Sequence, residues 1–292
     1  MNLSSNPTAH DSVTLVHATH LIQDSSEVAS FLKKSGFELL EFIKVSDGRN
    51  THCLQISLNE TYISFEKRNN LFTKEFVDIA LTGFGLGTKD IVSTQGRLTL
   101  HGFHPLAIEE QKLLFSEAKK ERREIECKVF KLKKSDVLEG NVEFIDVITS
   151  TKSDTKSVHY NALSHFHAII ICTDKPEETI ARYCWLTNQP SPRRIFNSSW
   201  QVVLGQQKII VCSVEEVERI FPSVNVTNLP SMLGYALLTK NLSKTKDYFS
   251  HNESLFQSLN QGSIQLKLPD FIGGNLIIGT NAADFPWNGD FN

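Results

Sequence analysis

The hydrophobic and polar positions of the chain predict a strand followed by a helix near its start. Residues 13–24 alternate between apolar and polar side chains as a half-buried β-strand does, and the run ends at an aspartate suited to capping a helix. Val28, Phe31 and Leu32 then share one face of a helical stretch. Gly36 is a suitable residue for the end of that helix.

The same pattern returns about 150 residues later in the chain. Residues 165–174 are an apolar run that ends at an aspartate, and the helical stretch that follows carries Ile180 and Leu186 on one face. In both copies a histidine lies seven residues before the aspartate that is expected to cap the helix. These two histidines are His17 and His167.

Two weaker copies lie between and after these, with glycine in place of the histidine. Gly83 lies seven residues before Asp90, and Gly234 lies seven residues before Asn241. The steps from each histidine to the following glycine are 66 and 67 residues. Because the two spacings agree within one residue, we interpret the chain as four copies of one unit.

Short β-rich runs follow the helices of the first and third units, with turn residues between them. They cover residues 37–45, 51–58, 61–66, 194–197, 200–204 and 208–212. The second unit is expected to carry an insertion at 91–103 and then a helix at about 105–122. A further helix is expected at 214–221, between the third and fourth units.

The repeat predicts an α+β fold of four βαβββ-like modules, paired into two curved, mostly antiparallel sheets with helices on their outer faces. Each domain is long enough to bury a core of its own. The expected parts of the chain are a disordered N-terminal segment (1–12), an N-terminal domain (13–150, modules 13–70 and 76–150), a linker (151–160), a C-terminal domain (161–280, modules 161–222 and 230–280) and an irregular surface tail (281–292).

The composition is that of an ordinary globular protein. The net charge of −3 argues against nucleic acid as a partner, because proteins that bind it carry a basic surface. The five cysteines are scattered and form no C-x-x-C pair, which favours a reducing compartment. No apolar run approaches the ~18 residues of a membrane helix. We therefore expect a cytoplasmic protein with a small-molecule ligand and no membrane partner, with a homodimer left open.

The first strand, its histidine and the helix closing at Gly36 and Phe37 resemble the start of a vicinal-oxygen-chelate module. This superfamily contains glyoxalases, bleomycin-resistance proteins and extradiol dioxygenases. Residues 159–165 also resemble the segment that leads into the second half of glyoxalase-like proteins, and the resemblance covers residues 13–279. It implies that paired modules form a cup, in which side chains from the first and last strands of each module often hold a divalent metal.

The resemblance implies particular ligands in the N-terminal cup. His17 matches the first-strand position of the first module, and its last-strand position falls near Ser64, where Glu66 on the same strand face could substitute. Gly83, at the next position, cannot bind a metal, whereas Glu143 can. We expect His17, Glu143 and Glu66 to bind Fe, Mn, Ni or Zn, or His17 and Glu143 to act as catalytic acid–base groups.

The C-terminal cup keeps one ligand in four by the same comparison. His167 is retained, but Ile210, Gly234 and Ile277 stand at the other positions. The iron site of extradiol dioxygenases therefore cannot be built from these positions, and we expect the C-terminal half to be mainly structural.

Other side chains are candidates for substrate contacts or for a lid. His52, His167 and Trp200 are expected to contact the substrate, and a loop carrying His101 and His104 could cover the first cup. Structural explanations stay open beside these. The histidines could be hydrogen-bonded without a metal, Glu143 and Glu66 could face solvent, and the tryptophan could belong to the core.

The run Gly83-x-Gly85-x-Gly87 is the one feature that resembles a nucleotide-binding loop. A dinucleotide fingerprint requires a helix directly after the glycine turn, within a parallel βαβ unit. We expect no helix immediately after this run, and the repeat already accounts for its first glycine. The sequence therefore predicts no nucleotide cofactor.

These observations favour a glyoxalase-like protein that binds or acts on a small oxygen-rich molecule in the N-terminal cup. Metal-assisted lyase, isomerase or dioxygenase chemistry is the leading hypothesis. The alternative is a metal-free binding or sequestering protein of the bleomycin-resistance type, which the glycines and isoleucines at ligand positions favour. A third hypothesis is a scaffold for a partner protein.

Overall fold

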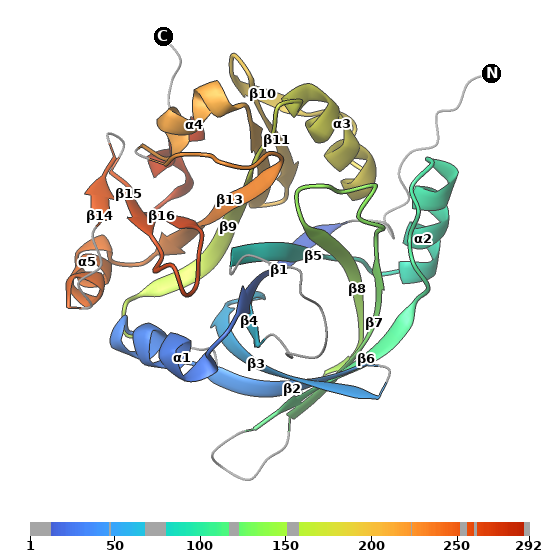
Figure 1. Ribbon diagram of the computed structural model, residues 1–292, viewed down its shortest axis with the longest axis horizontal. Coiled ribbons are helices and arrows are strands. Elements are labelled where there is room, and N and C mark those ends of the chain that lie inside the picture. Colours follow the sequence, from blue (N-terminus) through green and yellow to red (C-terminus); the bar gives the residue numbers. More distant parts are fainter. Residues whose placement is uncertain are drawn as a thin grey trace.

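The structure is a computed structural model that describes residues 13–46, 48–67, 80–116, 123–150, 158–222, 224–251, 256–259 and 262–288. These residues form sixteen strands in two sheets, together with five α-helices and two short 3-10 helices (Figure 1). The prediction of an α+β fold with two sheets is confirmed. No helix in the described part of the chain is long and apolar enough to cross a membrane.

The strands of the N-terminal half close into a barrel in the order β1-β4-β3-β2-β6-β7-β8-β5. Closure comes from antiparallel pairing of β2 with β6, where Phe42 lies opposite Phe115. The strands are β1 (Thr14–Ile22), β2 (Leu40–Ser46), β3 (Arg49–Leu58), β4 (Thr61–Lys67), β5 (Ala80–Gly87), β6 (Glu109–Phe115), β7 (Arg123–Lys131) and β8 (Asn141–Ser150).

The C-terminal half forms an open sheet in the order β10-β11-β12-β9-β13-β16-β15-β14. If the barrel is listed from β2, its order is β2-β3-β4-β1-β5-β8-β7-β6, which is the equivalent strand order. The barrel differs in that its first and last strands, β2 and β6, pair with each other. Each half therefore has the strand order of two paired modules. The strands are β9 (Leu163–Cys172), β10 (Arg193–Phe196), β11 (Ser199–Leu204), β12 (Gln207–Cys212), β13 (Ser231–Thr239), β14 (Phe256–Ser258), β15 (Ile264–Lys267) and β16 (Asn275–Gly279).

The helices begin close to the predicted positions. Asp24 caps α1 (Ser25–Lys34) by accepting a hydrogen bond from the backbone of Ser26, as predicted. Asp174 does not cap its helix, because α3 begins one residue later, after Lys175. The remaining helices are α2 (Ile91–Leu100), α3 (Pro176–Thr187), α4 (Val214–Ile220) and α5 (Leu242–Ser250).

Two predicted elements of the second unit are wrong. The expected insertion at 91–103 is mostly helix α2, and the expected helix at about 105–122 is strand β6 in its described part. Gln111, Leu113 and Phe115 of β6 are buried and alternate with exposed residues, which is the period of a strand. Pairing with β2 and β7 on both sides overrides the helix-forming character of this segment.

The expected surface tail is also wrong where the structure describes it. Two 3-10 helices, η1 (Ala282–Asp284) and η2 (Pro286–Asn288), follow β16, and Phe285 and Trp287 are buried. The expected N-terminal segment and most of the expected linker lie outside the described residues. The five cysteines are free and buried, in line with the absence of a disulfide framework.

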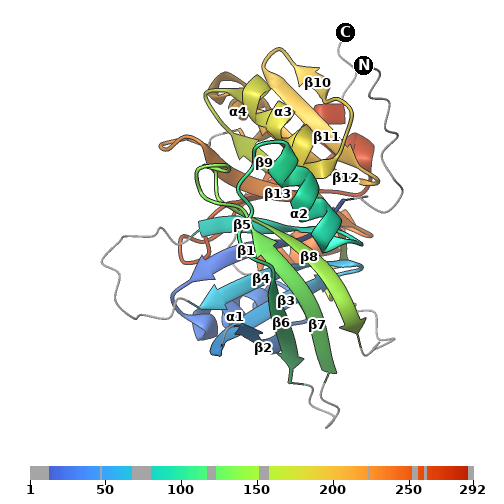
Figure 2. The same cartoon turned by 90° about the vertical axis from the view of Figure 1, so that its right-hand side faces the viewer.

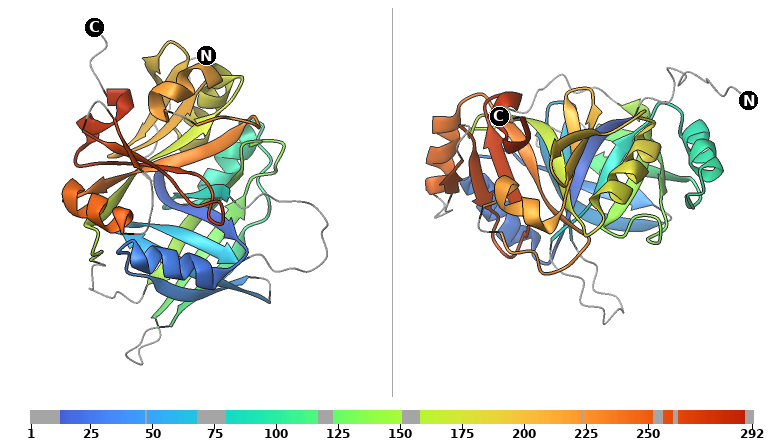
Figure 3. Two further views of the ribbon diagram at one scale, coloured as in Figure 1. Left: turned by 60° about the vertical axis from the view of Figure 1, so that its left-hand side comes forward. Right: turned by 90° about the horizontal axis from the view of Figure 1, so that it is seen from above.

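One large hydrophobic core contains residues of both halves. The C-terminal sheet lies against the N-terminal barrel in the ribbon views (Figures 2 and 3). The core is built from the outer face of the barrel, the facing side of the C-terminal sheet and helices of both halves. Arg182 donates two hydrogen bonds of 2.9 Å to the buried Glu139 across this junction. His20 is fully buried there, with its Nδ1 3.1 Å from the Ile272 carbonyl, and burial lowers the pKa of His20 to about 4.

Candidate functional site

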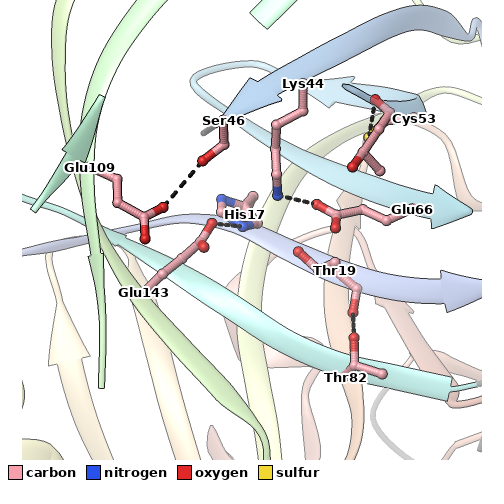
Figure 4. Close-up of polar contacts among 10 residues, drawn as sticks. His17, Thr19, Lys44, Ser46, Cys53, Glu66, Thr82, Glu109 and Glu143 are labelled. Atoms are coloured by element: carbon pink, nitrogen blue, oxygen red, sulfur yellow. Dashed lines mark hydrogen bonds and ion pairs between the residues drawn. The ribbon is translucent and has the colours of Figure 1, made fainter. Parts of the chain in front are cut away.

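The interior of the N-terminal barrel contains a cavity of about 80 Å³. Its charged and aromatic groups come from four different strands, and Figure 4 shows most of them pointing toward one another. The lining consists of Val16, His17, Phe42, Lys44, Tyr62, Ser64, Glu66, Gln111, Leu113, Ile125, Cys127, Val129, Glu143, Ile145 and Val147.

Strand geometry explains why His17 points into the barrel. A register shift between Leu15 and His17 marks a β-bulge in β1, and bulges change the direction of neighbouring side chains. On the adjacent strand β5, Gly85 lies opposite His17. A Cβ atom at Gly85 would lie 2.2 Å from the His17 Cε1 atom, so the imidazole fills the space that a side chain would need.

The glycine run of β5 is therefore explained by packing. Gly83, Gly85 and Gly87 alternate along one strand that pairs antiparallel with β1, and a Cβ at any of them would meet atoms closer than 3.0 Å. The expectation that no helix follows this run is wrong, because α2 begins at Ile91, and β5 also pairs in parallel with β8. The glycines nevertheless lie within strand β5 itself, whereas those of a dinucleotide-binding fingerprint lie in the turn between the strand and the helix.

His17 and Glu143 form the first polar pair of the cavity. The His17 Nε2 atom lies 3.2 Å from the Glu143 Oε1 atom, and the His17 ring stacks on Tyr62 with ring centroids 4.8 Å apart. Burial acts to raise the pKa of Glu143, but the hydrogen bond and charge of His17 and the charges of Lys44 and Lys131 lower that pKa to about 2. Glu143 is thus ionised at neutral pH.

Lys44 and Glu66 form the second pair, 2.6 Å apart between Nζ and Oε1. Their side chains are 17% and 22% exposed, so the pair is largely shielded from water. Burial acts to lower the pKa of Lys44, but the carboxylates of Glu66 and Glu143 outweigh it and raise that pKa above its usual value. The cavity therefore holds an ammonium group that is paired with Glu66 and is close enough to Glu143 to interact with its charge.

Two of the predicted substrate-binding residues lie away from this cavity. His52 is exposed on β3, in register with Ile43 of β2 rather than with the inward-facing residues. Trp200 is half-buried on β11 of the C-terminal sheet, with the Arg194 guanidinium 5.4 Å from its ring centroid. The structure does not bring either residue to His17.

His167 lies on the concave side of the C-terminal sheet, where the predicted second cup is filled. Its ring stacks on Phe285 with centroids 4.7 Å apart, and Phe285 in turn stacks on Trp287 at 5.1 Å. Burial, together with the charge of Lys208, lowers the pKa of His167 to about 4. His167 is therefore a neutral core residue.

The two histidines proposed for a lid have other partners. The His101 ring lies against Trp185 at a tilt of 39°, and His104 pairs with Asp136 at 2.9 Å. Among the predicted site residues, the structure brings together His17, Glu143 and Glu66. Sequence reasoning missed Lys44, although its place between Phe42 and Ser46, each two residues away on the same strand face, could have indicated it.

Comparison with known proteins decides the fold. No protein-family model matches the sequence, and a search of curated proteins found no match. The structure is similar to a 4-hydroxymandelate synthase variant from Streptomyces coelicolor (TM-score 0.56, 10% identity, 92% of each chain covered). It is also similar to the Mn(II)-bound glyoxalase from Novosphingobium aromaticivorans (0.58, 8% identity, 90% of this chain and 80% of that chain).

A third similar structure is 2,2′,3-trihydroxybiphenyl 1,2-dioxygenase from Sphingomonas wittichii (TM-score 0.56, 9% identity, 91% of this chain and 89% of that chain). The chain has the vicinal-oxygen-chelate fold. The resemblance to vicinal-oxygen-chelate proteins that the sequence indicated is confirmed for the fold. Identities of 8–10% establish a shared fold, and the activity has to be argued from the site of the vicinal-oxygen-chelate barrel itself.

The donor set of this barrel does not fit a divalent metal ion. Of the four ligand positions that the vicinal-oxygen-chelate resemblance implies, two carry His17 and Glu143 and two carry a serine and a glycine. Glu66 is held by the Lys44 ammonium. Across the described ranges, no three or more His, Cys, Asp and Glu side chains lie together in a way that could hold a metal.

Proposed function

We propose that the N-terminal barrel binds a small, uncharged, oxygen-rich organic molecule without a metal ion. The observation that supports this most strongly is the convergence of His17, Lys44, Glu66 and Glu143 in one cavity. Ligand hydroxyl groups would donate hydrogen bonds to the carboxylates, and a ligand carbonyl or hydroxyl oxygen would accept one from the ammonium.

The size of the cavity limits the ligand. About 80 Å³ leaves room for only a few water-sized groups, since a single water molecule needs at least ~10–15 Å³. Pockets for drug-sized ligands are several times larger, at ~300–1,000 Å³. The proposed ligand is therefore a molecule of two to four carbon atoms, such as a short polyol or a hydroxy-carbonyl compound.

The charge of the cavity favours an uncharged ligand. The carboxyl groups of Glu66 and Glu143 both line the cavity, and the Lys44 ammonium is already paired with Glu66. An anionic ligand would add a further negative charge beside two carboxylates in a shielded site, where like charges repel strongly. Small organic acids are therefore weaker candidates than polyols.

The same charges favour binding over proton-transfer catalysis. A general base is most effective when its pKa lies near the working pH, whereas the pKa of Glu143 is lowered to about 2. Such a carboxylate accepts hydrogen bonds well but removes protons poorly. This argument supports the metal-free binding protein over the metal-assisted enzyme, and catalysis by His17 and Glu143 stays a prediction.

Ligand-induced stabilisation tests the proposal. The probes are glycerol, dihydroxyacetone and glycolaldehyde, with glycolate as the anionic comparison. A ligand at 100 times its Kd stabilises the folded state by about 2.7 kcal/mol, which raises Tm by several degrees. We expect this for the wild type and for Glu126→Gln, which removes a more exposed carboxylate of the same barrel. Glu143→Gln should weaken binding at least tenfold.

Two results would contradict the proposal. One is equal stabilisation of the wild type and Glu143→Gln by every probe that binds, because the cavity carboxylate would then play no part. The other is binding of glycolate alone. Catalysis is measured separately, as turnover of the same probes by the wild type and by His17→Ala, with His104→Ala as the exposed control.

A further inference from the structure

The barrel interior contains an ammonium group among its carboxylates. Lys44 extends inward from β2, and its Nζ atom lies 2.6 Å from Glu66. Lys44 and Glu66 line the same cavity as the His17–Glu143 pair. Figure 4 shows the Lys44 side chain reaching into the space between Glu66 and His17.

An inward-facing lysine needs an explanation, because this side chain usually keeps its charged end in water. The register of β2 prevents Lys44 from placing its charged end in water. Phe42 and Ser46 lie on the same face of the strand, pairing with inward residues of β6, so the side chain between them also starts inward. A shielded ammonium is tolerated only when carboxylates compensate for its lost hydration.

The side chains around Lys44 are the ones that could bind a metal in its absence. His17 and Glu143 already lie 3.2 Å apart, and Glu66 is two residues along β4 from the expected ligand position. One imidazole and two carboxylates suit Mn²⁺ or Zn²⁺. In the wild type, however, the Glu66 carboxylate is bound to the ammonium.

We propose that Lys44 is a built-in cation that takes the place of a divalent metal in the barrel. The ammonium supplies the positive charge that holds the carboxylates together, and it occupies the space that an ion would need. This inference rests on the proposed function only in locating the site inside the barrel. It requires no knowledge of the ligand.

Replacing Lys44 by an uncharged side chain should therefore create a metal site. In Lys44→Met, which is similar in length, Glu66 is released and the two shielded carboxylates lose the ammonium group that interacts with both. We expect this variant to bind one Mn²⁺ or Zn²⁺ at least 100-fold more tightly than the wild type, measured by isothermal titration calorimetry and by elemental analysis after dialysis. Added metal should also raise its Tm and leave that of the wild type unchanged.

Three further variants make the result specific. Lys112→Met removes a half-exposed lysine from the same barrel, where it pairs with Glu124 and Glu126, and should bind no more metal than the wild type. The double variant Lys44→Met/His17→Ala should lose the metal again. Lys44→Gln serves as a second uncharged replacement if the methionine variant fails to fold, which far-ultraviolet circular dichroism would reveal.

The proposal is overturned if wild-type protein binds near-stoichiometric Mn²⁺ or Zn²⁺ and loses it in His17→Ala. It is also overturned if folded Lys44→Met or Lys44→Gln binds metal no more tightly than the wild type. Neither result depends on the ligand-stabilisation experiment of the proposed function, which leaves Lys44 in place and adds no metal. Failure of that experiment would likewise leave the metal titrations unchanged, so the two proposals can fail separately.

Discussion

The two halves of the molecule share one strand order but have different interiors. In the N-terminal half, the outer strands β2 and β6 pair, and the closed barrel surrounds a small polar cavity. In the C-terminal half, the sheet stays open and its concave side is packed with α4, Phe285 and Trp287. The order of strands therefore does not decide whether a cup is available to a ligand. The segments that close or fill the cup do.

The two repeat histidines show this difference at one position. His17 contacts a carboxylate in the cavity, whereas the ring of His167 stacks on Phe285 among apolar side chains. The same residue at the same place in the repeat is thus part of a candidate site in one half and part of a core in the other.

Removing the filling of the C-terminal cup would affect the molecule most. Trp287 is 2% exposed, and Trp287→Ala should lower the free energy of unfolding by about 3–5 kcal/mol, the usual cost of deleting a buried aromatic ring. Trp185→Ala is the control, because that ring is 53% exposed and should matter much less. Urea denaturation measures both. Similar losses in the two variants would mean that the C-terminal segment does not fill the cup.

Acid sensitivity should come from buried histidines rather than from the cavity. The pKa of His167 falls from 6.5 to about 4 on folding, so the unfolded chain takes up a proton first as the pH drops. The contribution of His167 to the free energy of unfolding is fully present above pH 6.5. It declines as the pH falls toward 4, by at most about 3 kcal/mol. His20 behaves in the same way. Glu143 contributes in a lower window, between pH 4.5 and about 2.

Denaturation of His167→Gln at several pH values tests this assignment. Its stability should depend on pH between 6.5 and 4 with a slope about one proton smaller than that of the wild type. His104→Gln, at an exposed position, should keep the wild-type slope. An unchanged slope in His167→Gln would show that His167 is protonated in the folded protein over this pH range. The C-terminal cup would then admit water to the His167 ring.

The smallest expected effect concerns the packing of His17. Gly85→Ala places a methyl group where the imidazole lies, and we expect a loss of about 1–3 kcal/mol together with weaker ligand binding. Gly96→Ala is the matched control, since nothing lies within 4 Å of its Cβ position in helix α2, and it should stabilise the protein by about 0.5–1 kcal/mol. Urea denaturation shows whether each variant is less or more stable than the wild type.

Much of the fold could be predicted because local and long-range signals agree. The strand at His17, the cap at Asp24 and the short strands of the first and third units all have the expected composition and turns. Strand β6 could not be predicted, because its glutamates, lysine and leucines are good helix formers. Its conformation is decided by β2 and β7, which are distant in sequence, and periodicity within one segment contains no information about them.

The candidate site was predictable only where the repeat or the family resemblance pointed to it. His17 occupies a repeat position, Glu143 occupies a position that the family resemblance implied, and the two side chains meet in the cavity. Lys44 lies outside those positions, and a lysine in a strand is normally interpreted as solvated. Its inward direction follows from the alternation of side chains along β2, which places it on the same face as Phe42 and Ser46 and which the repeat did not include. The burial of Phe285 and Trp287 was missed for a related reason, since a short terminal segment has no period to interpret.

The seam between β2 and β6 also bears on how the protein folds. It joins residues 42–46 to residues 111–115, with three strands and α2 between them in the chain. Contacts between such distant segments require the intervening chain to be ordered at an entropic cost before they contribute any stability. The polar cavity is enclosed only after this seam has formed. Ligand binding in the barrel is therefore a measure of completed folding, and partly folded chains that already contain the C-terminal sheet would not show it.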